Sequence, residues 1–289
     1  MTHDDLQILL DRANAANIKG NFDEAEHLAG QVIAGTTKEN EQHVSALLAI
    51  ADTARLRGDI DEAFYLVNQA LALAEYHNQA ANTALAWLML GMMHWPRGAY
   101  ELALEYLGKA LVAHENLGIK SGSARDMMNI GIVYEEMKHH EKALDYYRQA
   151  LAVYEEIGEP AGAATALSNI GKLYGAMGEN SSMMEYFLRA LELFERIGEK
   201  FGISFVTGNI GALYAERGKE QYNPEKAEEY QLKALQITEE MGAKQLLSVR
   251  HRALADFYEQ EKQWEKFAVH FKKFHDVMME IASEESKKQ

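Results

Sequence analysis

The chain has 289 residues, of which 47% are apolar, and its 44 acidic and 29 basic residues give a formal charge of −15. This apolar content excludes general disorder, and the length favours two domains or an elongated array over one compact domain. The absence of cysteine excludes disulfides, thiolate nucleophiles and cysteine-ligated metal sites. Because the basic residues form no dense cluster, we expect no nucleic-acid partner.

The first third of the chain has no segment suited to a membrane. The N-terminus reads MTHDDLQILL, with acidic residues where a secretory signal would carry basic ones. The segment from Tyr76 to Pro96 has no charged residue, but its purely apolar part, Ala84 to Met93, is about half of a membrane span. The sequence therefore predicts a buried helix here, no membrane partner and a cytoplasmic protein.

A repeat of 40 residues runs through the middle of the chain, as NIGIVY (Asn129–Tyr134), NIGKLY (Asn169–Tyr174) and NIGALY (Asn209–Tyr214). We use the glycine of this block as a marker. Small residues continue the marker series in both directions: Ala13, Ala51, Gly91, Gly131, Gly171, Gly211 and Ala255. Twelve residues after the markers, extended by four in the sixth copy, lies a second series: Ala25, Ala63, Ala103, Ala143, Met183, Ala227 and Phe267. Seven copies fill the chain, and a period of this length indicates a solenoid.

Each copy shows helical periodicity on both sides of a turn. A glycine marks that turn in five copies: Gly20, Gly58, Gly98, Gly178 and Gly218. Fifteen residues after the second marker stand residues that tolerate a left-handed helix end: Asn40, Asn78, Gly118, Gly158, Gly198 and Gly242. Three further glycines (Gly122, Gly162 and Gly202) are expected in the loops between copies. The predicted repeats, within one domain over 1–289, are 4–40, 41–78, 79–118, 119–158, 159–198, 199–242 and 243–282, with an exit segment at 283–289.

The last two copies depart from the pattern. In the sixth, four extra residues within GKEQYNPEKA predict a longer connection between its two helices. In the seventh, Ala282 occupies the helix-stop position, so the helix that starts near Trp264 is expected to continue through it.

This pattern resembles the tetratricopeptide repeat family over essentially the whole chain. The resemblance rests on Trp87–Leu90–Gly91, on Ile130–Gly131–Tyr134 and its two later copies, and on small–large pairs such as Ala143 and Tyr147. It implies an all-α fold, a right-handed α-solenoid or superhelix of seven antiparallel helix pairs. The period of 40 residues rather than 34, and the Gly/Asn stop, look like the long-repeat subclass of kinesin light chains, spindle-orientation adaptors and bacterial signalling proteins.

In that family the first helix of each pair lines a concave groove. Groove positions lie six, three and two residues before the marker and one and four after it, which is a single helical stripe. The resulting candidate residues for binding a peptide or protein are Leu85, Leu88, Met89, Met92, Arg125, Met128, Asn129, Ser168, Asn169, Lys172, Phe205 and Asn209.

Two features of this stripe suggest how a ligand is held. Asn129, Asn169 and Asn209 place one carboxamide in each of three repeats, and these groups can form hydrogen bonds with an extended peptide backbone. The alternative is that each asparagine only satisfies local polar groups. The third copy is apolar on its groove side, where Met89 and Met92 could adapt to apolar anchors. The alternative is that curvature of the array, or a chain terminus, buries this apolar stripe.

No chemistry-bearing motif accompanies the repeats. There is no HExxH and no histidine pair spaced for a metal, and the stretch from Gly211 to Lys219 has the wrong spacing for a phosphate-binding loop. His94 replaces the repeat's aromatic residue and is expected to pack rather than to catalyse. We therefore predict no enzymatic activity, no metal and no cofactor.

The sequence thus predicts a non-catalytic module that binds a peptide or protein segment, as the sensory or regulatory region of a bacterial signalling protein. The last helix resembles exit helices of bacterial sensor kinases and nucleotide cyclases, which implies an output domain beyond this chain. The alternative is a capping helix that covers the apolar face of the last repeat and then ends. Bacterial peptide-regulated phosphatases share the long repeat but carry an additional N-terminal bundle, so their activity is not expected. The alternative is a scaffold that forms homodimers through the apolar stripe or the last helix.

Overall fold

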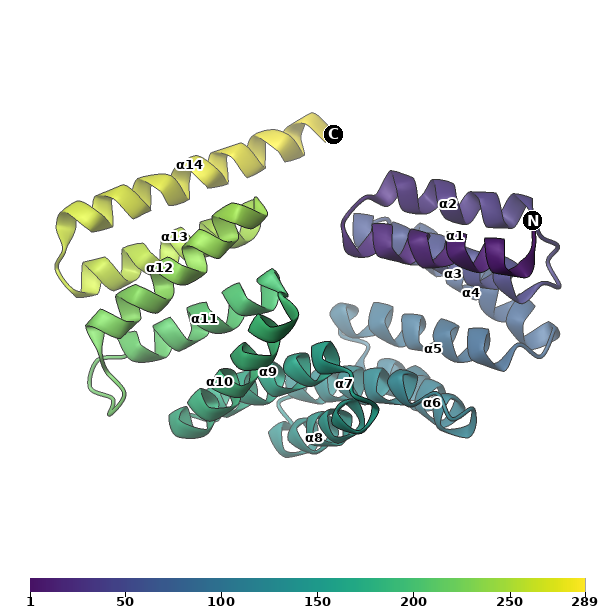
Figure 1. Cartoon of the computed structure of the whole chain (residues 1–289), viewed down its shortest axis with the longest axis horizontal. Helices are drawn as coiled ribbons and strands as arrows, with labels where there is room; N and C mark the ends of the chain where they lie inside the picture. The colour runs from purple at the N-terminus through teal and green to yellow at the C-terminus, as the bar shows by residue number, and fades with distance from the viewer. Residues whose placement is uncertain (289) are drawn as a thin grey trace. The chain divides into compact units, whose positions relative to one another are not determined.

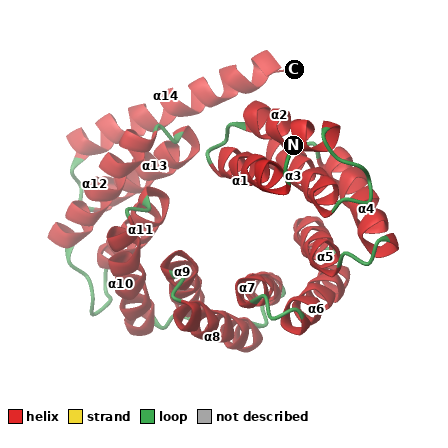
Figure 2. Ribbon diagram, turned by 45° about the vertical axis from the view of Figure 1, so that its right-hand side comes forward, coloured by secondary structure: helices red, strands yellow, loops and turns green. Residues whose placement is uncertain are grey.

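The computed structural model describes the backbone of residues 1–288 and the side chains of residues 1–283. Within these residues the chain is all helical, as Figures 1 and 2 show, with no strand. The first helices of the seven pairs are α1 (His3–Ile18), α3 (Glu41–Arg57), α5 (Ala80–His94), α7 (Lys120–Glu136), α9 (Pro160–Ala176), α11 (Lys200–Ala215) and α13 (Lys244–Gln260). The second helices are α2 (Phe22–Ala34), α4 (Ile60–Tyr76), α6 (Tyr100–Asn116), α8 (His140–Ile157), α10 (Asn180–Ile197), α12 (Pro224–Met241) and α14 (Trp264–Lys288), and a short 3-10 helix, η1 (Trp95–Arg97), follows α5. The predicted all-α array of helix pairs is confirmed.

The helices form two compact units, Met1–Val153 and Tyr154–Gln289. In the first unit α1, α3 and α5 contact one another in series, and each packs against the second helix of its own pair. In the second unit α9, α11 and α13 do the same. Each core therefore lies between neighbouring helices of the sequence, the packing mode of a repeat protein.

The marker glycines let the two helices of a pair approach closely. A Cβ atom on Gly131 would lie 2.5 Å from the ring of Tyr147, and one on Gly171 would lie 2.8 Å from Phe187. Tyr147 and Phe187 are fully buried. The predicted close approach of the two helices of a pair at the small marker residue is therefore confirmed in these two repeats.

The prediction that Gly122, Gly162 and Gly202 lie in loops is wrong. They lie inside the first turns of α7, α9 and α11, because these helices begin only two residues after the preceding stop glycine. Each makes room for a ring from the preceding helix, at Cβ distances of 2.7 Å (His114), 2.4 Å (Tyr154) and 2.6 Å (Phe194). These glycines are thus packing residues of the joint between repeats.

Five of the six predicted helix stops are left-handed, with positive φ at Asn78, Gly118, Gly158, Gly198 and Gly242. Asn40 is the exception. It has φ −75° and caps the N-terminus of α3, where its side chain accepts a hydrogen bond from the backbone N–H of Gln42 at 2.8 Å. The helix before it ends much earlier, at Ala34. Asn40 therefore starts a helix rather than ending one.

The five turn glycines also have positive φ, and the two copies without glycine place Lys138 (φ 63°) and Lys262 (φ 57°) in the same conformation. A left-handed residue thus recurs seven residues after each marker, whatever its side chain.

The four extra residues of the sixth repeat lengthen the α11–α12 connection, as predicted, to residues 216–223. Asn223 caps α12 by accepting from the backbone N–H of Lys226 at 2.9 Å. Tyr222 and Arg217 both donate to the Glu261 carboxylate, at 2.9 and 3.1 Å. The longer connection is therefore tied to the C-terminal end of α13.

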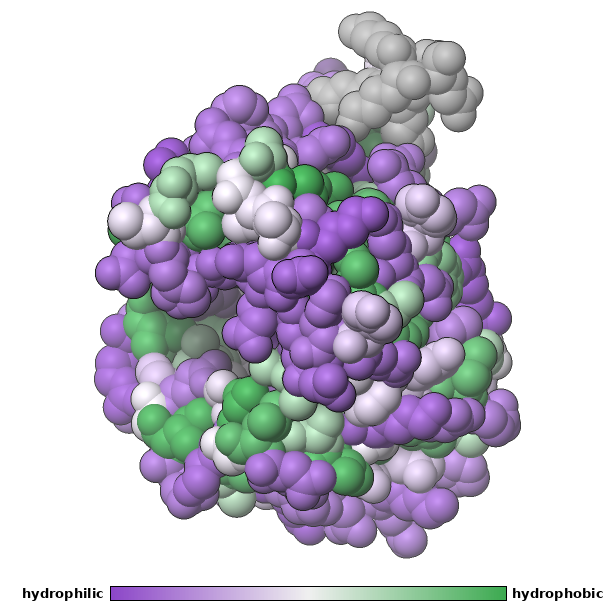
Figure 3. Space-filling model, turned by 90° about the vertical axis from the view of Figure 1, so that its right-hand side faces the viewer, coloured by the Kyte–Doolittle hydropathy of each residue, from purple (hydrophilic) through white to green (hydrophobic). Residues whose placement is uncertain are grey.

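The uncharged segment of the third repeat is the largely buried helix α5, as predicted. Among the described residues no helix is both long and apolar enough to cross a membrane. On the face drawn in Figure 3, hydrophilic residues cover most of the surface, and hydrophobic residues occur in small groups among them. The predicted continuation of the last helix is confirmed, since α14 runs through Ala282.

Candidate functional site

The first helices of the first four pairs line a hollow of about 670 Å³ within the first unit, with α7 contributing Arg125. Its apolar part contains Leu10, Leu48, Leu88 and Met89, each at most 5% exposed. The other lining residues are Gln7, Asn14, Asn17, Ile18, Ser45, Ala49, Asp52, Arg55, Leu56, Leu85, Met92 and Arg125. The hollow thus combines an apolar floor with a polar margin, as ligand-binding clefts usually do.

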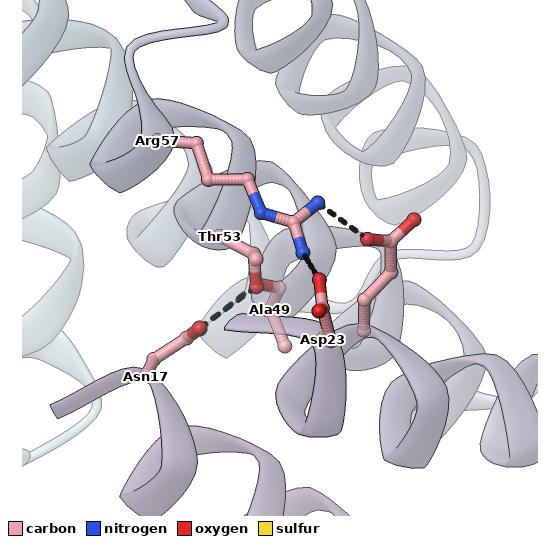
Figure 4. Close-up of polar contacts among 6 residues, drawn as sticks. Asn17, Asp23, Ala49, Thr53 and Arg57 are labelled. Carbon is pink, nitrogen blue, oxygen red and sulfur yellow. Dashed lines mark hydrogen bonds and ion pairs between the residues drawn. The ribbon is translucent and has the colours of Figure 1, made fainter. Parts of the chain in front are cut away.

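Much of the polar margin is already hydrogen-bonded. The Asn17 amide donates to the carbonyl of Ala49 at 3.3 Å and accepts from the Thr53 hydroxyl at 2.8 Å (Figure 4). Arg55 donates from Nη2 to Asp52 Oδ1 at 2.6 Å. The bonds of Asn17 hold α1 against α3, and the Arg55–Asp52 bond fixes two side chains within α3, so the wall of the hollow is preorganised.

An ion-pair cluster behind this wall joins the first two repeats. Arg57, at the end of α3, pairs with Asp23 and, at 2.7 Å, with Glu26 of α2 (Figure 4). Both acids are well exposed, so the cluster orients the helices rather than contributing much stability.

Arg125 differs from the other polar lining residues. It is exposed on α7, and its guanidinium makes no ion pair or hydrogen bond with a side chain in the described part of the chain. The adjacent Asp126 is fully buried and bonds His114 instead, with 2.6 Å between Nδ1 and Oδ2. Burial raises the pKa of Asp126, and the hydrogen bond with His114 opposes that rise.

Of the twelve candidate residues, the hollow brings together Leu85, Leu88, Met89, Met92 and Arg125. Met128 is buried in α7 and does not line the hollow. Asn129 is half-buried, and its Nδ2 donates to the carbonyl of Arg125 in its own helix at 2.7 Å. In the first unit, therefore, the four apolar candidates of α5 share a surface, whereas Met128 is buried elsewhere and the asparagine is engaged locally.

The remaining candidates lie in the second unit, on α9 and α11. Ser168 is buried, Lys172 is exposed, and Asn169, Phe205 and Asn209 are half-buried. The Nδ2 of Asn209 donates to the carbonyl of Phe205 at 2.8 Å, the same local bond that Asn129 makes. The Oδ1 of each asparagine stays available as an acceptor, so a row of carboxamides facing a ligand remains a prediction.

Sequence reasoning missed the contribution of the first two repeats to the hollow. Applying the groove positions to the markers Ala13 and Ala51 would have identified every lining residue of these two repeats except Ile18 and Leu56. The residues so identified are Gln7, Leu10, Asn14, Asn17, Ser45, Leu48, Ala49, Asp52 and Arg55. The signal was present in the sequence, but the absence of an Asn-Ile-Gly block in these repeats concealed it.

The histidine expected to pack does so. His94 stacks on Tyr106 at 5.6 Å between ring centroids and lies 5.1 Å from Phe64. Burial and the nearby Arg97 lower the pKa of His94, which favours the neutral ring. No group of three or more His, Asp or Glu side chains that could hold a metal ion occurs in the described residues.

Comparison with known proteins agrees with this repeat architecture. Two models described as tetratricopeptide repeat match residues 82–156 and 164–196. A search of curated proteins finds no significant match.

Three solved structures illustrate the similarity in fold. A signal-transduction ATPase with a tetratricopeptide repeat sensor from Pyrococcus horikoshii superposes with a TM-score of 0.73 at 17% identity, over 99% of this chain and 44% of its own. Aspartyl phosphate phosphatase F from Bacillus subtilis superposes with a TM-score of 0.66 at 16% identity, over 94% of this chain and 68% of its own. The Rap conjugation gene regulator of plasmid pLS20, in complex with the Phr* peptide, superposes with a TM-score of 0.66 at 16% identity, over 95% of this chain and 75% of its own. At these identities the likeness is one of fold, and the two matching models identify residues 82–156 and 164–196 as members of the tetratricopeptide repeat family.

Proposed function

We propose that this chain is a non-catalytic module that binds a peptide or protein segment along the stripe formed by the first helices of its repeats. The observation that carries the proposal is the hollow of the first unit, where three successive repeats present large apolar side chains beside polar groups. An extended segment meets one repeat after another, so its side chains can be read in order along the stripe.

Proteins of similar fold support this proposal and a role in signalling. Two of them are Rap proteins in complex with the Phr* peptide and with competence and sporulation factor, and a third is a signal-transduction ATPase with a repeat sensor. We infer a sensory or regulatory role on this basis. The continuation of α14 through Ala282 supports transmission of a signal along that helix to an output domain.

The test begins with selection of binders from a random dodecapeptide library on the full chain. Met92→Glu places a charge on the half-exposed wall of the hollow and is expected to abolish binding of the selected peptides. Val112→Glu on α6 is the matched control, because Val112 is 57% exposed and belongs to a second helix. Selected peptides that bind the Met92→Glu variant as tightly as the unmodified chain would contradict the proposal.

The second candidate function is a scaffold that self-associates through α14. None of the residues 264–283 is fully buried, and Trp264 and Met279 are 59% and 73% exposed. A terminal repeat normally presents a polar outer face, so an aromatic one favours a contact with another surface. Sedimentation between about 1 and 100 μM, concentrations that span ordinary affinities, should show association that Trp264→Lys with Met279→Lys removes. A monomer at every concentration would exclude the scaffold.

A further inference from the structure

The structure points to the chemistry of the segment that the hollow selects, and this inference rests on the proposed function. We propose that the hollow takes a segment with a large aliphatic side chain and, toward α7, an acidic side chain that pairs with Arg125.

The floor of the hollow explains the aliphatic preference. Leu48 and Leu88 are each 1% exposed and present only carbon atoms, and they form a surface continuous with Met89. The two neighbouring residues of α5, Leu85 and Met92, are half-exposed, so they can close over an inserted side chain. Methionine adapts its shape at little cost, which suits an aliphatic group of several sizes. A polar side chain placed there would lose its water without gaining a partner.

The margin of the hollow explains the acidic preference. Its charged lining residues are Asp52, Arg55 and Arg125, a net positive set in a chain whose formal charge is −15. Asp52 and Arg55 neutralise each other at 2.6 Å. Arg125 is left as the exposed cation, and its sequence neighbour Asp126 is buried against His114. An acidic group on the ligand therefore finds a partner here, whereas a basic group meets repulsion.

The polar groups also set a direction for the segment. Asn14 is exposed on α1, in the first repeat, and its side chain makes no hydrogen bond in the described part of the chain. Arg125 belongs to the fourth repeat, and the apolar residues of α3 and α5 come between the two along the array. A bound segment would thus present a backbone amide to Asn14, its aliphatic side chain to the floor and its acid to Arg125.

The experiment uses the full chain with methyl-¹³C-methionine, because the signals of Met89 and Met92 report directly on the floor. The probes are three short peptides with blocked ends, Gly-Leu-Gly-Glu-Gly and its Glu→Lys and Leu→Ser analogues. We expect the Glu peptide to shift both methyl signals. Its dissociation constant should be about fivefold lower than that of the Lys analogue, which is the difference that a partly exposed ion pair makes. The Ser analogue should leave both signals unchanged.

Arg125→Gln should abolish the discrimination between the Glu and Lys peptides, while Arg196→Gln, at an exposed arginine of α10, should preserve it. Equal affinity of the Glu and Lys peptides for the unmodified chain would overturn the acidic preference and leave the proposed function intact. Library-selected peptides that bind without moving the Met89 and Met92 signals would overturn the hollow as the anchor site. Failure of the library to yield any binder would instead count against the proposed function itself.

Discussion

The repeats are held together by residues whose size matters more than their polarity. Gly131 in α7 and Tyr147 in α8 meet so closely that no atom fits between them. His114 in α6 and Gly122 in α7 form the same kind of pair at the joint between the third and fourth repeats. Such contacts leave little freedom for substitution on the small side, because the large partner is buried and cannot move into solvent.

Gly131→Ala should therefore lower the free energy of unfolding by about 1–3 kcal/mol, the usual cost of overpacking. Gly108→Ala in α6 is the control, since a Cβ there meets nothing within 4 Å and alanine favours the helix. The control should gain about 0.5–1 kcal/mol. Urea unfolding of both variants measures the two effects, and an equal response would show that the close approach to Tyr147 is not rigid.

The buried pair of His114 and Asp126 predicts a pH-dependent contribution to stability. Burial raises the folded-state pKa of Asp126, so the folded chain holds this proton more tightly than the unfolded chain does. Its contribution to stability is present at low pH and is lost as the pH rises through the raised pKa. Asp126→Asn keeps a hydrogen-bonding partner for His114 without the ionisation.

The stability of the Asp126→Asn variant relative to the unmodified chain should consequently increase as the pH rises above about 4, the ordinary pKa of an aspartate, and level off above the raised pKa of Asp126. Unfolding curves in urea at several pH values give this difference. A loss of several kcal/mol at pH 7 would instead show that the ionised pair stabilises the fold.

At the scale of helices and turns, the array repeats a backbone conformation rather than a sequence. The turn within each pair is left-handed at the same position in all seven copies, five times with glycine and twice with lysine. A lysine in this conformation costs about 1–2 kcal/mol relative to glycine, and the gain in unfolded-state entropy on mutation to glycine offsets part of it.

Lys138→Gly should thus raise the free energy of unfolding by about 0.5–1 kcal/mol. The reverse change at the equivalent position, Gly178→Lys, should lower it, because nothing lies within 4 Å of that glycine and only the backbone conformation (φ +79°) opposes a side chain. Thermal unfolding compares the two variants. Destabilisation by Lys138→Gly would mean that the lysine side chain has a stabilising contact of its own.

The longer α11–α12 connection should be dispensable. Removing residues 219–222 joins Gly218 to the capping residue Asn223, much as the shorter turns of other repeats are built. Loop length has a weak effect on stability, and Arg217 would retain its ion pair with Glu261. The melting temperature should change by only about 2–4 °C, as for the loss of one hydrogen bond. A fall several times larger would assign a structural role to the contact between Tyr222 and Glu261.

At the scale of the whole molecule, stability is distributed along the chain because, within each of the two described units, the helices pack against neighbours in the array. Helices inside the array pack on two sides, as α5 does against α4 and α6, whereas α14 packs against α13. None of the residues 264–283 is fully buried, in keeping with this one-sided packing.

Hydrogen exchange should therefore be faster in α1 and α14 than in α5 or α11, whose backbones open only when neighbouring repeats open. Mass spectrometry of peptides from each helix measures this order. Protection of α14 equal to that of α11 would indicate that another surface covers it, and would favour the scaffold over a free terminal helix.

By itself, the sequence determined the helix pairs, their number, and the stripe of α5 that holds Leu85, Leu88, Met89 and Met92. These follow from periodicity and from single-residue backbone preferences, which act locally and recur in every copy. The helix through Ala282 belongs to the same class, because it depends on one residue that resists a left-handed turn.

Only the tertiary structure decided where the hollow lies, why Asn40 starts a helix, and why Gly122 packs under His114. It also separated Arg125, which stays exposed, from its neighbour Asp126, which is buried. The physical reason is that burial depends on the distances between helices. Those distances are set jointly by many side chains far apart in the sequence, so no local pattern contains them.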